Sequence, residues 1–154
     1  GRYETGLPWR ANHPPLPNNR VGSVRRLTSL TSKLDREGLR SKYNEILQEQ
    51  RLDGIIKSAN NPSKGVEFYI PHKPVRRSCA ETTKIRVVYD ASARAHNAAP
   101  SLNECLHPGP SLTNKLWNVL VRGRFHPIAL NGDLQKAFLQ ISVRESDRDA
   151  LRFH

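Results

Sequence analysis

An apolar run that ends in an aspartate, with an aromatic five residues later, constrains this chain most. Residues 127–133 (PIALNGD) predict a buried strand, and residues 136–138 (KAF) predict a helical turn directly after it. A carboxylate on the last residue of a rigid strand can hold a hard divalent cation, and the following turn can project an aromatic over a bound ligand. Asp133 is therefore a candidate metal ligand, and Phe138 a candidate contact to the ligand. Asp133 could instead cap the helical turn, and Phe138 could belong to the core.

The charge of the chain indicates a polyanionic partner. Twenty-five Lys and Arg against fourteen Asp and Glu give a formal net charge of +11 and an isoelectric point near 10.3. Residues 1–77 carry 15 basic and 7 acidic groups (+8), while residues 78–154 carry 10 and 7 (+3). Such an excess is typical of nucleic-acid binders, and a solvated basic face is the alternative.

The first part of the chain predicts an arm and two helices. Residues 1–22 are rich in proline and predict an extended arm with few large apolar anchors. The helices are expected to be separated near Gly38, and the second to end near Gly54. Apolar residues recur at helical spacing at Val24, Leu27, Leu30 and Leu34, and at Leu39, Tyr43, Ile46 and Leu47.

Two β-rich runs, residues 66–70 and 85–89, predict an antiparallel pair. Between them, residues 71–84 are expected to form a long, mobile tip. This tip could act as a cationic clamp over a bound phosphate, and a solvated hairpin tip is the alternative. Its basic residues are Lys73, Arg76, Arg77 and Lys84.

A further helix is predicted from Leu112 to Leu120, with Ser111 or Thr113 as N-cap and Gly123 beyond its end. Trp117 lies in this amphipathic run and is interpreted as a packing residue rather than a base-stacking platform. The sequence also predicts a turn at 60–65, irregular chain at 90–100 and the opening of a strand at 150–153.

Signals of compartment are sparse. Cys79 and Cys105 stand at no metal-ligand spacing and predict neither a zinc site nor a disulfide framework, so an intracellular, reducing compartment is expected. The sequence has no long apolar run and no signal-peptide core. It also lacks Met, which suggests a segment of a longer polyprotein.

Several segments occur in an order that resembles one family, the reverse transcriptases of BEL/Pao-type LTR retrotransposons. The likeness covers nearly the whole chain, and it is the order of the motifs that is specific. They are residues 1–9 (GRYETGLPW), 69–75 (YIPHKPV), 84–93 (KIRVVYDASA), 101–106 (SLNECL) and 132–141 (GDLQKAFLQI).

The resemblance implies an α+β fold, namely the fingers and part of the palm of a right-hand polymerase, truncated. The arm would be residues 1–22, the fingers-like region 23–126, and the first part of the palm 127–154. The implied activity is RNA-directed DNA polymerisation, which adds deoxynucleoside triphosphates to a primer on an RNA or DNA template with two Mg²⁺ ions.

The resemblance also assigns roles near the metal. Asp133 matches the first catalytic aspartate, which binds both Mg²⁺ ions. Phe138 matches the aromatic beneath the sugar 2' position, which excludes ribonucleotides by its size. The backbone amides of Leu134 and Gln135 could contribute to the triphosphate cradle.

In the fingers, Arg86 matches the arginine that contacts the incoming triphosphate. Arg77, or less closely Arg76, matches the basic residue on the γ-phosphate side, where a guanidinium fork suits phosphate oxygens. Arg86 could also be the polar face of an alternating strand. Asp90 is interpreted as structural, paired with Arg94 or another basic neighbour.

The chain departs from the family in one respect, because it ends before the Tyr-X-Asp-Asp motif. One carboxylate cannot hold two Mg²⁺ ions about 3.5 to 4 Å apart, so we expect no polymerisation by these residues alone. The implied partners are template-primer, deoxynucleoside triphosphates and the rest of the polyprotein, in the cytoplasm or in virus-like particles. The alternatives are a non-catalytic basic nucleic-acid-binding module and a decayed copy of the element.

Overall fold

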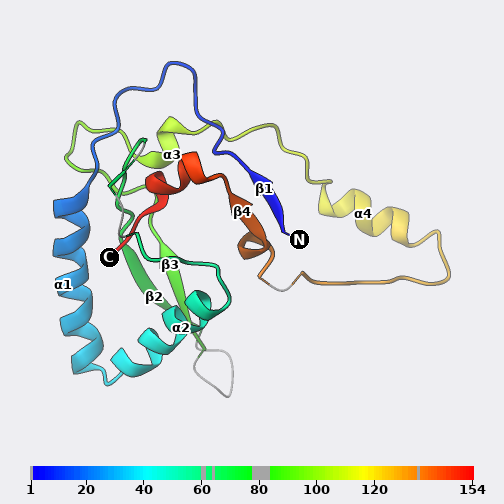
Figure 1. Ribbon diagram of the computed structural model, residues 1–154. Helices are drawn as coiled ribbons and strands as arrows, with labels where there is room; N and C mark the ends of the chain where they lie inside the picture. The colour runs from blue at the N-terminus through cyan, green and yellow to red at the C-terminus, as the bar shows by residue number, and fades with distance from the viewer. Residues whose placement is uncertain (1, 60–61, 64, 78–83, 135) are drawn as a thin grey trace.

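Two helices packed on a hairpin form the first layer of the fold (Figure 1). The computed structural model describes residues 2–59, 62–63, 65–77, 84–134 and 136–154. The helices are α1 (Arg20–Arg36) and α2 (Arg40–Leu52), and the antiparallel hairpin consists of β2 (His72–Arg77) and β3 (Lys84–Tyr89).

The remaining elements are short. They are β1 (Tyr3–Thr5), α3 (Leu102–Cys105), α4 (Leu116–Gly123), β4 (Ile141–Val143) and two 3₁₀ helices, Ala137–Gln140 and Glu145–Leu151.

The two helices expected from the apolar spacing are present as α1 and α2. Leu30 and Leu34 of α1 and Tyr43 of α2 are buried against Ile85 of β3, because each helix turns its apolar stripe toward the hairpin. Between the helices Gly38 has a φ of +64°, a conformation that glycine adopts without steric cost. The first core of the molecule therefore lies between the helices and one face of the hairpin.

The hairpin prediction was wrong about its first strand. Residues 66–70 do not pair with β3; the strand is β2, which lies inside the segment predicted to be a mobile tip. In the register of the pair, His72 lies opposite Tyr89. Residues 78–83, the rest of the predicted tip, are outside the described residues, as are 60, 61 and 64 of the predicted turn.

Phe68 and Ile70 are buried in a second core instead of a sheet, together with Leu102 of α3. Their backbone N–H groups donate to the carbonyl oxygens of Asp149 and Arg152, at 3.0 and 2.7 Å. Buried N–H groups need an acceptor, and here the C-terminal segment supplies it. Contacts with distant residues therefore override the local preference for a hairpin strand.

The N-terminal arm lies against this second core. β1 pairs in parallel with β4, and Leu7, Trp9 and Leu16 pack on the buried residues. The Asp147 carboxylate accepts hydrogen bonds from Leu7 N (2.8 Å) and Trp9 Nε1 (3.1 Å). The arm ends at Arg20, where α1 begins slightly earlier than predicted.

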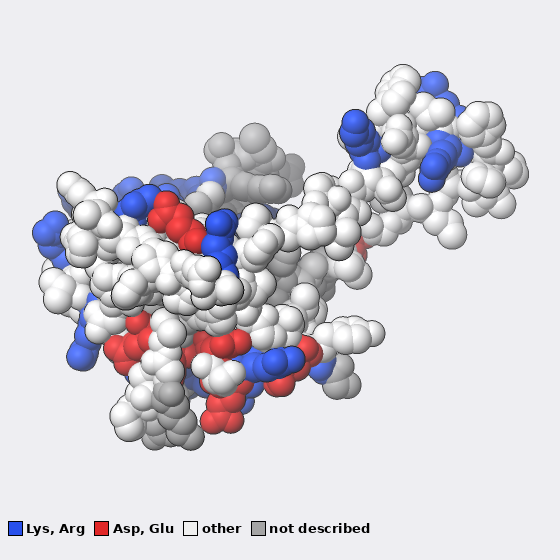
Figure 2. Space-filling view, turned by 90° about the horizontal axis from the view of Figure 1, so that it is seen from above, with Lys and Arg blue, Asp and Glu red and all other residues white. Residues whose placement is uncertain are grey.

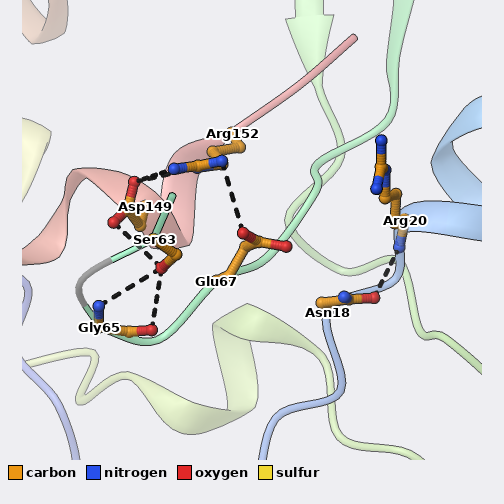
Figure 3. Close-up of polar contacts among 7 residues, drawn as sticks. All are labelled: Asn18, Arg20, Ser63, Gly65, Glu67, Asp149 and Arg152. Carbon is orange, nitrogen blue, oxygen red and sulfur yellow. Dashed lines mark hydrogen bonds and ion pairs between the residues drawn. The ribbon is translucent and has the colours of Figure 1, made fainter. Parts of the chain in front are cut away.

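A polar cluster joins the C-terminal segment to the chain before β2 (Figure 3). Arg152 donates to Asp149 at 2.8 and 2.9 Å and lies 3.4 Å from the Glu67 carboxylate. Ser63 Oγ donates to Asp149 at 3.1 Å. Hydrogen bonds to Tyr69 and then to Asp149 raise the pKa of Arg152 above its ordinary value.

The strand predicted at 150–153 is absent. A 3₁₀ helix runs to Leu151, and Arg152 forms an isolated bridge with Tyr69. Ala150 of this 3₁₀ helix is buried in the second core.

α4 and the chain that follows it stand apart from the two cores (Figure 1). Lys115 is the N-cap of α4, so neither Ser111 nor Thr113 caps it. Trp117 is 71% exposed, which corrects its interpretation as a packing residue. Residues 127–133, predicted as a buried strand, form irregular and exposed chain, because no described strand lies beside them to pair with.

Candidate nucleic-acid interface

The β2–β3 hairpin presents two different faces. Val75 lies opposite Arg86 and Lys73 lies opposite Val88, and residues directly opposite each other share a face. All four are exposed, so they form the outer face of the hairpin, away from the helices. This outer face therefore carries two cationic side chains, Arg86 and Lys73, beside two valines.

Arg76 belongs to the other face. It lies opposite the buried Ile85, and its guanidinium forms an ion pair with Glu37, at the turn between α1 and α2. Arg76 and Arg86 are therefore not brought together, and Arg76 connects the hairpin to the helices. Arg77 is the last residue of β2, and its backbone lies opposite that of Lys84 in β3.

A buried hydrogen-bond chain fixes the hairpin from its inner side. His72 Nε2 lies 2.8 Å from the His154 carbonyl oxygen, which can only accept, so Nε2 carries the proton. Nδ1 then accepts from the Tyr43 hydroxyl at 2.6 Å. Burial raises the pKa of Tyr43, and it raises that of the neighbouring Tyr89 to about 12. Both tyrosines thus remain neutral, and their hydrogen bonds, Tyr43 to His72 and Tyr89 to Gln50, join the hairpin to α2.

The residues matched to the metal end of a polymerase site lie elsewhere. Asp133 is exposed in irregular chain, and the next residue, Leu134, is 80% exposed. Phe138 lies on the 3₁₀ helix that precedes β4 and is 92% exposed. Gln135 is outside the described residues. Asp133 therefore does not end a strand here, and the expected strand-to-helix junction is not formed.

The described residues do not fit a magnesium site. Mg²⁺ needs a near-octahedral set of oxygen ligands, with one or two carboxylates and several waters or phosphates. Across the described ranges, no three His, Cys, Asp or Glu side chains gather where they could hold a metal ion. Asp133 offers one carboxylate, which is only part of such a set.

A cleft of about 710 Å³ lies between the first turns of α1 and residues 90–97, and its rim is rich in arginine. Asp90 is bound from both sides, by Arg26 at 2.7 Å and by Ser92 Oγ at 2.5 Å. The Ser92 hydroxyl, followed by Arg26, lowers the pKa of Asp90. Asp90 is thus structural, as interpreted, but its partner is Arg26 instead of Arg94. The cleft lining also includes Arg25, Arg94, His96 and Asn97.

This cleft was missed at the level of the sequence. Its two walls are more than sixty residues apart along the chain, and no local pattern links them. One signal for its support was present: Ser101 and Glu104 have the S-x-x-E spacing of a capping box. In the structure they form that box at the start of α3, and Glu104 also pairs with Arg94 at 2.5 Å.

No protein-family model matches the chain, and comparisons with curated proteins and with solved structures give no match. None of the helices in the described ranges combines the length and the apolar character needed to cross a bilayer.

Proposed function

We propose that this chain binds nucleic acid as the first part of an RNA-directed DNA polymerase. The order of motifs in the sequence carries this proposal, and the outer face of the hairpin supports it. There Arg86, matched to the arginine that contacts the triphosphate, points away from the core and shares its face with Lys73. An exposed arginine on a paired strand is a suitable donor to phosphate oxygens.

Within this proposal Arg86 and Lys73 neutralise phosphate charge, while Arg76 positions the hairpin through its ion pair with Glu37. The cleft with Arg25 and Arg94 offers a second cationic surface, suited to a nucleic-acid backbone. The resemblance would give Asp133 the role of one carboxylate ligand, but the described residues alone do not make a magnesium site around it.

Primer extension tests the catalytic part of the proposal. The protein for this test is the chain extended by the residues that follow it in its reading frame, assayed with Asp133→Asn and, as matched control, Glu145→Gln. Glu145 is also an exposed carboxylate. We expect extension in the parent and in the control and none in Asp133→Asn. Full activity of Asp133→Asn would contradict the role of Asp133.

A second candidate function is a nucleic-acid-binding module without catalysis. Asp133 is exposed, and in the described chain it does not belong to a group of three His, Cys, Asp or Glu side chains that could hold a metal ion; both observations favour the module. Both functions require nucleic-acid binding, and only the first requires Asp133. Tight binding with no primer extension in any of the three proteins would select the module.

A further inference from the structure

The outer face of α1 carries cations along most of its length. At 100° per residue, Arg25, Ser32 and Arg36 fall within about 40° of one another, and Lys33 lies about 80° from Arg25. The buried Leu34 lies on the opposite side of the helix. The three cations are exposed, and the acid of α1, Asp35, lies about 80° from Arg25 on the side away from Lys33.

These cations are available to a ligand. Within the described part of the chain, Arg25, Lys33 and Arg36 form no ion pair. The nearest acid along the helix, Asp35, is held by Arg40 at 3.0 Å. Because the Asp35 carboxylate pairs with Arg40, it does not neutralise the positive charge of Arg25, Lys33 and Arg36.

The hydroxyl groups between these cations donate their hydrogen bonds within α1. Thr28, Ser29 and Ser32 each donate to the backbone carbonyl four residues earlier, at 3.1 to 3.2 Å. Their protons are therefore used within the helix. The donors that this face presents to a partner are guanidinium and ammonium groups.

We propose that the outer face of α1, defined by Arg25, Lys33 and Arg36, binds the phosphate backbone of nucleic acid. The inference rests on the proposed function and adds to it a surface separate from the hairpin. Arg25 to Arg36 spans about 16 Å of helix, while phosphates of one strand in a duplex follow each other every ~3.4 Å along its axis. A strand can therefore meet several of these cations at once.

The chemistry of the stripe selects this partner over a lipid surface. A helix that lies on a membrane buries an apolar face beside its cations, whereas this stripe holds only cations and hydroxyls between Arg25 and Arg36. Figure 2, which looks roughly along α1, shows Lys and Arg side chains on that side of the body. Arg25 also lines the arginine-rich cleft, so the two surfaces are continuous.

The position of the stripe makes it independent of the hairpin site. Leu30 and Leu34 of α1 pack toward Ile85 on the inner face of the hairpin. The outer face of α1 and the outer face of the hairpin consequently point in different directions. Each face can be removed by mutation while the other is left intact.

Binding of short RNA and DNA oligonucleotides to the full chain at several salt concentrations tests the inference. The test protein is Arg25→Gln/Lys33→Gln/Arg36→Gln, since Gln keeps helix propensity close to that of Arg and Lys. A matched control, Arg51→Gln/Lys57→Gln/Arg122→Gln, removes the same charge from exposed positions outside α1. Lys73→Gln/Arg86→Gln reports on the hairpin, and circular dichroism verifies the folding of each protein.

We expect the α1 variant to bind more weakly and the slope of log affinity against log salt to fall by about 2 to 3, at 0.7 to 0.9 per phosphate. The charge-matched control should lose less than one unit of slope. An α1 variant no weaker than this control would overturn the inference while leaving the proposed function intact. Failure of the parent chain to bind any oligonucleotide would overturn the proposed function itself.

If the α1 variant loses its helical signal, the single variants decide the matter. Arg25→Gln, Lys33→Gln and Arg36→Gln should each lower the salt slope by about one unit or less, at 0.7 to 0.9 per phosphate. Unchanged slopes in all three folded single variants would overturn the inference.

Discussion

Asp147 joins the N-terminal arm to the C-terminal segment. Its two carboxylate oxygens accept one hydrogen bond each, from Leu7 N and Trp9 Nε1, and both donors lie in the arm. A charged acceptor makes stronger hydrogen bonds than a neutral one, and these bonds are partly shielded from water. A single side chain thereby connects the two ends of the sequence.

Replacing Asp147 by Ala should destabilise the chain by about 1 to 3 kcal/mol, because two donors lose a charged acceptor. Urea unfolding followed by tryptophan fluorescence measures the change. Glu145→Ala, in the same 3₁₀ helix but exposed, is the control and should stay within about 0.5 kcal/mol of the parent. Equal stability of the two variants would show that Asp147 does not hold the arm.

His154 predicts a pH dependence of stability. Burial, followed by the charges of Arg20 and His72, lowers its pKa below the ordinary value of 6.5. Between pH 6.5 and the lowered pKa the unfolded chain therefore binds more protons than the folded chain, so the free energy of unfolding falls as the pH drops through this range. His154→Phe keeps a ring to stack on Tyr69 but cannot titrate.

We expect His154→Phe to lose less stability than the parent between neutral and mildly acidic pH. Urea unfolding at a series of pH values gives the two curves. Their difference at alkaline pH, where the histidine is neutral in both states, measures packing alone and serves as the baseline. Parallel curves across the whole series would contradict the role given to His154.

Short elements of this molecule depend on specific side chains more than on helix propensity. α3 has only four residues, and its start is fixed by the Ser101–Glu104 capping box, with Ser101 itself buried. The box also orients Glu104 toward Arg94 at the edge of the arginine-rich cleft. The helix thus links the second core to the candidate binding surface.

Ser101→Ala should lower the free energy of unfolding by about 1 kcal/mol, since the first turn of α3 loses its cap. Thermal unfolding checks this value. Ser111→Ala is a matched control, because Ser111 was predicted to cap a helix and is exposed without doing so. An equal effect of the two substitutions would mean that the capping box contributes nothing measurable.

At the scale of the whole molecule, apolar side chains between residues 112 and 138 remain in contact with water. Leu116 and Trp117 on α4 and Phe125 after it are each more than two-thirds exposed. An exposed apolar stretch of this kind favours association. We expect concentration-dependent self-association of the chain in sedimentation velocity experiments.

Leu116→Ser/Trp117→Ser should reduce this self-association. Val21→Ser/Leu52→Ser is the control, because those two side chains are as exposed but stand singly on the body. If both double variants associate like the parent, the stretch around α4 is not the cause.

Local pattern was sufficient for part of the fold. The apolar spacing of α1 and α2 and the break at Gly38 could be predicted because a helix makes its hydrogen bonds within itself and needs only one packed face. The strand 85–89 was also found, since β-branched residues dominate it. For Asp90 the structural role was predicted, but its partner was not.

The rest depended on tertiary structure. A strand needs a partner strand, so the sequence alone could not show that residues 66–70 bond to the C-terminal segment while β2 takes their place beside β3. The strand predicted at 127–133 is likewise absent, because none of the described strands pairs with it. The sequence by itself determined helices α1 and α2, the basic charge and the motif order. Only the tertiary structure decided that Arg76 pairs with Glu37 and that Arg86 and Lys73 share the outer face of the hairpin, because both depend on strand register. It also decided that Arg25 and Arg94, far apart in the sequence, line the same cleft.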